Sequence, residues 1–331
     1  MPTVELRYPD AVRCVETDPY ETVYQAATRS GAPILTDCLE GACATCKARC
    51  TEGDYELIDP SFDALSADEE RAGYVLLCQM EARGSCTVEM PYTLAFASNA
   101  QPRTVTCVVQ EIAPVGASIV RLRIEAAVPF DFVPGQYAQV QVPGTNFRRA
   151  YSFATEPGEC TAEFYVRLLE GGVMGGYLHG RAQPGDEVQI ELPFGGFYLR
   201  PGTGPLVAVS GGTGLAPILS MLTQFAQCGA GREVHVLHGA RAPDDLFGLD
   251  AIRAMGGDAF ALSLHLAVED NATGELHAGQ VTELLTPELL GTDGTDVYLC
   301  GPPPMVSSAE ARLAQFGVPT ARVFAERFNP A

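Results

Sequence analysis

The pattern of hydrophobic and polar positions changes twice along the chain and divides it into three segments. In the first segment, alternating positions predict strands at TVELRYP, VRCVET, KARCTEG, YVLLCQ and CTVEMPY. A helix is predicted over VYQAATRS, with Asp18 as its cap, Glu21 completing a capping box and Gly31 ending it. Strands mixed with one helix predict a small α+β domain over residues 1–96, followed by a linker, ASNAQPR, at 97–103.

The middle segment, residues 102–201, consists of short strands with alternating polarity, such as SIVRLRIEA, QYAQVQVP, EFYVRLL and EVQIELP. Pro-Gly pairs and other turn residues separate them at short, regular intervals. This pattern is typical of an antiparallel β-barrel.

The last segment, residues 203–331, contains continuous apolar runs: PLVAVSG, EVHVLHG, FALSLHLAV and DVYLCG. Such runs indicate strands buried on both faces of a sheet. Helical stretches, including APILSMLTQFAQCG and SSAEARLAQFG, lie between them, and this alternation predicts a doubly wound parallel α/β sheet. The predicted fold is therefore multidomain: an α+β domain, an antiparallel β-barrel and an α/β domain.

Length and charge narrow the classes of function. A chain of 331 residues suits two or three domains. The net charge of −20 argues against nucleic acid or an anionic membrane surface as a partner, and no apolar run is long enough to span a bilayer. The N-terminal residues do not form a secretory leader, so 11 cysteines predict metal or redox chemistry in a reducing, cytoplasmic compartment. We expect a monomer.

Three of the cysteines, Cys38, Cys43 and Cys46, have the spacing C-x4-C-x2-C, and a fourth, Cys78, follows after 31 intervening residues. This is the plant-type spacing for a [2Fe–2S] cluster held by four thiolates. A structural zinc site usually takes its ligands from two separate C-x2-4-C pairs, which this pattern does not offer. Cys50 lies outside the pattern and is predicted not to be a ligand.

The barrel segment contains a four-residue motif, Arg149-Ala150-Tyr151-Ser152, that is weak by itself. It gains meaning from GGVMGGYL (171–178), which predicts a short helix whose N-terminus suits a pyrophosphate. An arginine for phosphate, an aromatic ring and a hydroxyl together are typical of a flavin site. A barrel with several tight turns would also account for these residues.

The α/β segment begins with a strand, a glycine turn and a helix, VAVSGGTGLAPILSML, where doubly wound sheets bind a dinucleotide pyrophosphate. Its glycines (211, 212 and 214) do not match the G-x-G-x-x-G fingerprint. The last long apolar strand leads into Cys300-Gly301-Pro302, which places a thiol where ligands bind at the carboxyl end of a strand. The alternative is a buried cysteine before a proline turn.

At this point the motifs resemble those of a known family. RAYS, GGTGLAP, CGPPPM and ERF occur in the order of the ferredoxin–NADP reductase superfamily. With the N-terminal plant-type motif, the chain is similar over essentially its whole length to the reductase components of bacterial aromatic-ring-hydroxylating dioxygenases, of the benzoate/anthranilate type. DCLEGACATCKA, GYVLLCQ, PGQY and FGGFYLR carry this closer resemblance. It implies a β-grasp ferredoxin domain, a flavin barrel and a nucleotide-binding domain.

The resemblance also implies a role for individual residues. The iron ligands would be Cys38, Cys43, Cys46 and Cys78. The FAD site would comprise Arg149 on the phosphates, Ala150, Tyr151 against the flavin ring, Ser152 near its N5, and Gly172, Val173 and Met174 offering backbone groups to the pyrophosphate. Many family members have serine at the position of Gly175, so the resemblance does not carry over the phosphate hydrogen bond of that residue. The nicotinamide nucleotide would contact Gly211, Gly212, Thr213, Gly214, Asp245, Cys300, Gly301, Pro302, Glu326 and Phe328. Ser152, Cys300 and Glu326 would lie where hydride passes from nicotinamide to flavin.

The function that follows is transfer of electrons from NADH through FAD and a [2Fe–2S] cluster to a terminal oxygenase component. The alternatives keep the electron path but change the acceptor, to a diiron phenol or methane-type monooxygenase or a deoxysugar dehydratase; a redox sensor without turnover is a third class. Arg241 could bind the 2′-phosphate of NADPH, but Asp244 and Asp245 follow it and oppose that charge, so NADH is predicted. Asp37 and Glu40 flank the first iron ligand and predict docking on a basic partner surface.

Overall fold

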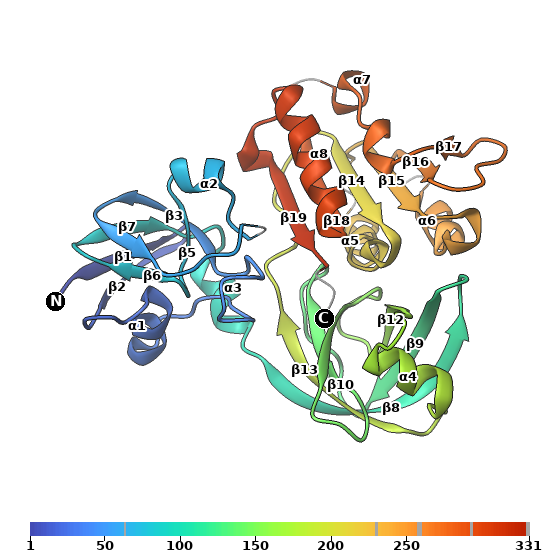
Figure 1. The fold of residues 1–331 in the computed structure, drawn as a ribbon, viewed down its shortest axis with the longest axis horizontal. Helices are drawn as coiled ribbons and strands as arrows, with labels where there is room; N and C mark the ends of the chain where they lie inside the picture. The colour runs from blue at the N-terminus through green and yellow to red at the C-terminus, as the bar shows by residue number, and fades with distance from the viewer. Residues whose placement is uncertain (63, 229–230, 257–259, 292–293, 329–331) are drawn as a thin grey trace. The chain divides into compact units, whose positions relative to one another are not determined.

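The computed structural model describes residues 1–62, 64–228, 231–256, 260–291 and 294–328, and the chain forms two compact units (Figure 1). Residues Met1–Pro102, with Phe194–Gly196, make up the first unit, and Arg103–Pro193 with Phe197–Ala331 make up the second. The predicted barrel and α/β segments therefore share one unit. The boundaries 1–96, 102–201 and 203–331 stay predictions.

The first unit is the expected α+β domain. Its mixed sheet has the order β2-β1-β7-β3-β5, in which β1 pairs with β7 in parallel and the other neighbours are antiparallel. The strands are β1 (Thr3–Tyr8), β2 (Ala11–Glu16), β3 (Lys47–Glu52), β5 (Tyr74–Leu76) and β7 (Cys86–Glu89), and a two-stranded ribbon joins β4 (Tyr55–Leu57) to β6 (Met80–Ala82). Helix α1 (Val23–Ser30) buries Val23, Ala26 and Ala27. The β-grasp prediction is confirmed.

The start of α1 differs from the prediction. Thr22, and not Asp18, is the cap: its hydroxyl accepts from the N–H of Gln25, and the Gln25 side chain accepts from the N–H of Thr22. Glu21 does reach back to the N–H of Asp18, at 2.9 Å, but Tyr20 between them has φ +65°. A left-handed residue cannot belong to the first turn of a right-handed helix, so the helix starts one turn later.

The predicted linker at 97–103 is helical in its first part. Helix α3 (Leu94–Asn99) starts at Thr93, whose hydroxyl accepts from the N–H of Phe96. The carboxylate of Asp10, more than 80 residues earlier, accepts from the N–H groups of Leu94 and Ala95 at 2.6 and 3.2 Å. This distant cap satisfies the first turn and stabilises a helix that local polarity does not predict. The prediction also missed α2 (Ala67–Arg71), which a Ser66–Glu69 capping box starts.

The second unit begins with the predicted barrel. Its sheet has the order β11-β10-β13-β8-β9-β12. The strands are β8 (Arg103–Pro114), β9 (Ile119–Ala126), β10 (Tyr137–Gln141), β11 (Arg148–Ser152), β12 (Thr161–Arg167) and β13 (Glu187–Phe194). The two edges approach each other just past β11, where the N–H of Ala154 donates to the carbonyl of Glu163 on β12 at 3.0 Å. Helix α4 (Val173–Gly180) follows β12.

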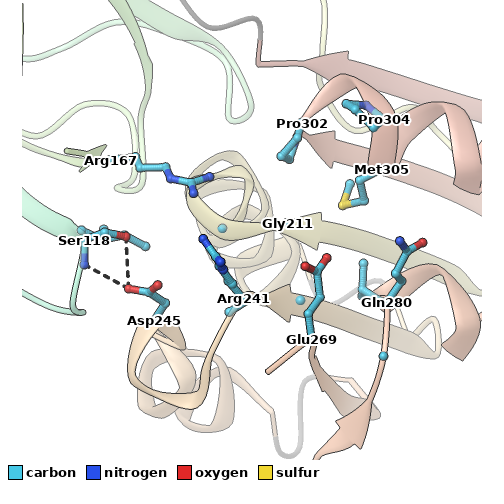
Figure 2. Close-up of a pocket in the computed structure, with 16 residues that line it drawn as sticks. Ser118, Arg167, Gly211, Arg241, Asp245, Glu269, Gln280, Pro302, Pro304 and Met305 are labelled. Carbon is cyan, nitrogen blue, oxygen red and sulfur yellow. Dashed lines mark hydrogen bonds between the residues drawn. The ribbon is translucent and has the colours of Figure 1, made fainter. Parts of the chain in front are cut away.

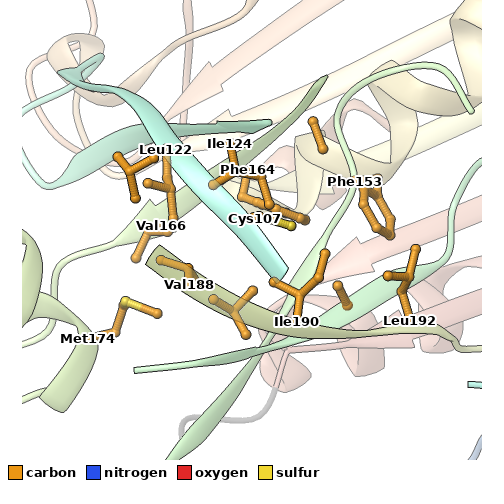
Figure 3. Packing of buried hydrophobic residues seen from close by; sticks show 14 of the residues in the cluster. Cys107, Leu122, Ile124, Phe153, Phe164, Val166, Met174, Val188, Ile190 and Leu192 are labelled. Atoms are coloured by element: carbon orange, nitrogen blue, oxygen red, sulfur yellow. The ribbon is translucent and has the colours of Figure 1, made fainter. Parts of the chain in front are cut away.

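Alternate residues of the barrel strands fill its interior. Figure 3 shows Leu122, Ile124, Val188 and Ile190, from two different strands, converging with Phe164 on one cluster. Each of these side chains is at most 2% exposed. The alternation seen in the sequence is therefore the inward and outward alternation of a barrel wall.

The rest of the second unit is a parallel sheet with the order β17-β16-β15-β14-β18-β19. Its strands are β14 (Leu206–Gly211), β15 (Val234–Ala240), β16 (Leu262–Val268), β17 (His277–Ala278), β18 (Asp296–Gly301) and β19 (Val323–Arg327), and its helices are α5 (Leu215–Cys228), α6 (Leu249–Met255), α7 (Pro287–Leu290) and α8 (Pro303–Gln315). Successive residues of β14 belong to different cores: Leu206 and Ala208 to the one with α5 and α6, Val207 and Val209 to the one with α8. The sheet is thus covered on both faces, as predicted.

Barrel and sheet are bound to each other within this unit. The Ser220 hydroxyl of α5 donates to the carbonyl of Thr155 at 2.6 Å, and Gln227 donates to Glu156 at 2.6 Å. The rings of Tyr165 and Phe247 pack with centroids 4.3 Å apart. Among the described residues, no helix is long and apolar enough to cross a membrane.

Candidate functional site

The loop that carries three of the predicted iron ligands has an unusual backbone. Leu39 and Ala44 both have φ near +60°, a conformation that costs side-chain-bearing residues about 1 kcal/mol or more each. Gly41 between them has φ +73°, and a Cβ there would meet the Gln79 side chain at 2.8 Å. Such strain persists where surrounding structure imposes it, often at functional sites.

The four predicted ligands form two pairs of thiols. Cys38 and Cys43 lie within hydrogen-bonding reach of each other, and the Cys46 and Cys78 sulfurs are 3.4 Å apart. The N–H groups of Glu40 and Ala42 also approach the Cys38 sulfur, at 3.4 Å each. Donation from Cys43, together with these N–H groups, lowers the pKa of the Cys38 thiol to about 5.

This pairing fits a two-iron cluster. Within the described part of the chain, no three His, Cys, Asp or Glu side chains converge to hold a single metal ion. In a [2Fe–2S] core with four thiolates each iron takes two, so paired thiols are the arrangement such a cluster needs. Backbone N–H groups aimed at sulfur stabilise the thiolate form. The four cysteines therefore suit the predicted cluster, and their assignment stays a prediction.

Cys50 belongs to a different pair. It is buried on β3 within hydrogen-bonding reach of Cys86, and its thiol donates to the carbonyl of Glu52 at 3.3 Å. Its place supports the expectation that Cys50 is not a ligand.

The flavin motif lies on β11, at one edge of the barrel sheet. Ser152 is buried, and burial raises the pKa of the half-buried Tyr151 above its usual value, which keeps the phenol neutral. The Tyr151 ring lies 6.4 Å from Phe164 across the barrel closure. Arg149 donates to the carbonyl of Arg148 and lies over the Phe147 ring, and in the described structure no carboxylate pairs with it. Its charge is therefore available to a phosphate.

The first turn of α4 has no side-chain cap on its N–H groups. Gly172 is its N-cap, and no side chain accepts from its first N–H groups. A Cβ at 172 would lie 3.0 Å from the carbonyl oxygen of Leu169, so a side chain would push the turn away from the loop that follows β12. Uncapped N–H groups at a helix N-terminus suit a pyrophosphate, and Val173 and Met174 occupy this turn. These residues and β11 fit the predicted FAD site.

The glycine turn after β14 is pressed against the end of β18. Gly211 ends β14, and Gly212–Gly214 form a 3₁₀ turn before α5. A Cβ at Gly214 would come within 2.1 Å of the Cys300 carbonyl oxygen, and one at Gly211 within 2.6 Å of the Met305 sulfur. The structure thus brings the predicted nucleotide residues of both motifs, Gly301 and Pro302 included, to one place.

The predicted hydride-transfer residues of this sheet are also neighbours. Cys300 on β18 pairs with Ser210 on one side and with Glu326 of β19 on the other. Cys300 is fully buried, and this burial, with the nearby Glu326 carboxylate, raises its thiol pKa well above the ordinary value. The N–H of Phe328 donates to the carbonyl of Gly301 at 2.8 Å. β19 and the residue that follows it thus place Glu326 and Phe328 beside the end of β18.

A pocket of about 280 Å³ opens between the barrel and the carboxyl ends of the parallel strands (Figure 2). Gly211, Gly212, Asp245 and Pro302 of the predicted set line it, whereas Thr213, Gly214 and Cys300 do not. Sequence reasoning missed most of the other lining residues, among them Ser118 and Arg167 from the barrel, Val281, and Glu269 and Gln280 from the segments after β16 and β17. The position of Glu269 one residue beyond an apolar strand was a usable signal; the barrel residues offered none.

The carboxylate of Asp245 lines the pocket but already has hydrogen-bond partners. Its Oδ1 accepts from the backbone N–H and the hydroxyl of Ser118, at 3.1 and 3.2 Å. Asp244 does not line the pocket. The sequence had suggested these two carboxylates for the choice between NADH and NADPH. In the structure Asp245 links the sheet to the barrel, and Asp244 is an exposed side chain outside the pocket.

Comparison with known proteins agrees with this architecture. Three family models match: 2Fe-2S iron-sulfur cluster binding domain at residues 9–83, oxidoreductase FAD-binding domain at 106–198, and oxidoreductase NAD-binding domain at 208–311. The predicted cofactors, FAD, a [2Fe–2S] cluster and a nicotinamide dinucleotide, correspond to these three domains.

Relatives match over almost the whole chain. The 2-halobenzoate 1,2-dioxygenase electron transfer component of Burkholderia cepacia is 38% identical over 99% of this chain and 98% of its own. The propane 2-monooxygenase reductase component of Mycolicibacterium goodii is 35% identical over 93% and 92%. The crystal structure of an Amycolatopsis cytochrome P450 reductase has a TM-score of 0.73 at 29% identity, covering 100% of this chain and 99% of that one. The chain therefore belongs to the ferredoxin–reductase family of flavin and iron–sulfur electron-transfer oxidoreductases that includes the electron transfer components of aromatic-ring dioxygenases.

Proposed function

We propose that this protein takes electrons from NADH and delivers them to the terminal oxygenase component of an aromatic-ring dioxygenase. The observation that carries the proposal is the presence of the three binding domains on one chain that matches a dioxygenase electron transfer component from end to end. When bound, a flavin accepts a hydride from nicotinamide and releases its two electrons singly, which is how a [2Fe–2S] cluster accepts them.

The residues of this chain would bind and orient the groups. Arg149 would pair with flavin phosphate, and the N–H groups after Gly172 would donate to the pyrophosphate. Tyr151 would offer an apolar ring surface, and Ser152 a hydroxyl near N5. The glycine turn after β14, whose Gly211 and Gly212 line the pocket, would receive the nucleotide.

A few side chains would define where hydride passes. Cys300 and Glu326 would line that contact, with Phe328 against the ring's other face. None of these residues needs to act as a general acid or base, because hydride transfer between two rings depends on their placement.

The cluster edge would be the exit for electrons. Cys38 lies in a loop where Leu39 and Glu40 are exposed, so a partner can approach this ligand closely. Half of the net charge of −20 falls within residues 1–100. Such a surface would accelerate encounters with a basic patch on the oxygenase.

The second candidate is a reductase for a multicomponent monooxygenase. It rests on the propane 2-monooxygenase and xylene/toluene monooxygenase relatives, which are 34–36% identical over 93% of this chain. The electron path within the chain would be the same, and the acceptor alone would differ.

The test has two stages. Purified protein, reconstituted with FAD and iron–sulfur, should reduce ferricyanide and cytochrome c rapidly with NADH; binding without turnover would indicate a redox sensor instead. Reconstitution with an aromatic-ring dioxygenase oxygenase component should then give product coupled to NADH oxidation. Turnover with a diiron monooxygenase hydroxylase, and none with the dioxygenase component, would contradict the proposed acceptor.

A further inference from the structure

Three neighbouring strands of the parallel sheet approach their carboxyl ends in the same way, with a polar residue followed by glycine: Ser210-Gly211 on β14, His238-Gly239 on β15 and Cys300-Gly301 on β18. Ser210 pairs in register with His238 on one side and with Cys300 on the other. Glu326 of β19 continues this row beyond Cys300. Because paired residues of neighbouring strands project from the same face of a sheet, four polar side chains form one row across four strands.

Ser210 and His238 of this row are joined by a hydrogen bond. The hydroxyl of Ser210 and Nδ1 of His238 are 3.0 Å apart, and both residues are fully buried. The imidazole also packs against Phe247, with ring centroids 5.8 Å apart and an interplanar angle of 81°. Burial lowers the pKa of His238 to about 4, so the ring is neutral near neutral pH and the bond joins two uncharged groups.

Stability alone does not account for a histidine at this place. Within the described part of the chain, Nε2 of His238 is buried and has no hydrogen-bond partner. Such a nitrogen loses its hydration without compensation, and an apolar side chain of similar volume would avoid this cost. A buried polar group of this kind therefore calls for a reason other than packing, and the bond from Nδ1 to Ser210 supplies one.

The Ser210–His238 bond holds strand ends that border the pocket. Gly211 and Gly239 are the next pair along β14 and β15, and both line the pocket, where Figure 2 labels Gly211. Glycine has no side chain that could fasten one strand end to the next. Among the paired residues of these two strands, the side-chain bond one position earlier is therefore the link nearest to the pocket.

We propose that His238 is a positioning residue for the hydride step: by binding Ser210 it fixes the end of β14 beside Cys300, which would line the nicotinamide–flavin contact. His238 itself touches neither ring and moves no proton. The proposal rests on the proposed function, because it concerns the transfer of hydride from NADH. It adds a residue on β15 to the set that the motifs on β14, β18 and β19 predicted.

The test is the limiting rate of flavin reduction at saturating NADH, measured by anaerobic stopped flow on protein reconstituted with FAD and iron–sulfur. His238→Leu and Ser210→Ala should each lower this rate roughly tenfold, as expected from a small misplacement of reacting groups, while the dissociation constant of NAD⁺ changes little. His238→Gln keeps a hydrogen-bonding group for Ser210 and should recover most of the rate. The double variant should be no slower than either single variant, because both changes break the same bond.

His265→Leu is the matched control. It makes the same substitution on the neighbouring strand β16, but its register partner Leu237 belongs to the core on the other face of the sheet. Flavin reduction in this variant should match that of the unmodified protein.

A second readout does not depend on turnover. In protein labelled with ¹⁵N in its five histidines, added NAD⁺ should shift the ring-nitrogen signals of His238 and leave those of His265 in place. The absence of these signals in His238→Gln identifies them. In Ser210→Ala the signals of His238 should no longer respond to NAD⁺.

An unchanged rate of flavin reduction in His238→Leu and Ser210→Ala, equal rates in the Leu and Gln variants of His238, or losses that multiply in the double variant would overturn the proposal. Urea unfolding shows whether each variant is folded, and if His238→Leu is not, Ser210→Ala and His238→Gln decide. Failure of the unmodified protein to accept hydride from NADH would instead contradict the proposed function.

Discussion

Gly214 lies directly against the carbonyl oxygen of Cys300, so close that a Cβ at 214 would come within 2.1 Å of it. The first helical turn after β14 and the end of β18 are therefore in backbone contact. Real Cβ atoms do not approach an oxygen so closely, and one of the two segments would have to move.

Gly214→Ala should separate these segments, lower the affinity for NADH and destabilise the protein by about 1–3 kcal/mol. Gly176→Ala is the control, since a Cβ there meets nothing within 4 Å and the residue lies inside α4. That change should stabilise by about 0.5–1 kcal/mol. Urea unfolding and NADH titration check both; equal stability of the two variants would show that the backbone contact at 214 has no energetic weight.

Cys78→Ser should lose most of the iron and acid-labile sulfide while retaining FAD. Cys50→Ser should keep the full content of both, because Cys50 pairs with Cys86 and not with the four predicted ligands. Iron and sulfide analysis, with the visible absorption of flavin as the control for folding, decides between them. Equal losses in the two variants would refute the ligand assignment.

Asp296→Ala should destabilise the second unit by about 3–5 kcal/mol. The Asp296 side chain is 6% exposed and binds Arg232, 5% exposed, at 2.6 Å and Arg322 at 2.9 Å. Without this carboxylate the Arg232 guanidinium would remain buried with an uncompensated charge. Asp250→Ala, which removes a fully exposed carboxylate, should have no measurable effect on the same denaturation curve. A similarly small effect at Asp296 would contradict the prediction.

Acidification should destabilise the protein through His238. Burial lowers the pKa of this fully buried imidazole from 6.5 to about 4. The unfolded state therefore binds more protons than the folded state between these pH values, so stability falls as pH drops from about 6.5 to 4, by an amount on the order of 3 kcal/mol. His238→Gln retains a donor or acceptor for Ser210, 3.0 Å from Nδ1, and should lose this part of the pH dependence. Parallel slopes of unfolding free energy against pH in both proteins would disprove it.

Electron delivery to the oxygenase should slow as salt is added, whereas flavin reduction by NADH in the same sample changes little. Exposed charges are screened beyond about 8 Å at physiological ionic strength, and Glu40 is exposed next to the cluster loop. Replacing Asp37 and Glu40 by Asn and Gln should lower the rate at low salt and flatten its salt dependence. Stopped-flow measurement of oxygenase reduction checks this, and an unaltered rate and salt dependence would place the docking surface elsewhere.

The local sequence by itself determined the cysteine loop, the glycine turn after β14 and the two types of strand. The C-x4-C-x2-C spacing places three thiols in one loop whatever the rest of the fold, and the glycines after β14 permit a turn that other residues could not form. Alternation of polar and apolar residues, or its absence, showed which strands belong to the barrel and which to the parallel sheet. A barrel wall buries one face of each strand, whereas a covered parallel sheet buries both.

The tertiary structure decided what depends on distant residues. The sequence predicted Asp18 as the helix cap, whereas the left-handed residue Tyr20 delays the start of the helix and makes Thr22 the cap. Asp245 had the sequence position of a ribose-binding carboxylate, but Ser118, 127 residues earlier, occupies its oxygen. Glu269 follows β16, and it lines the same pocket as Asp245 because β16 pairs with β15 in register. A sequence records which side chains are available, whereas the hydrogen bonds of the folded sheet determine which of them remain without a partner at the pocket.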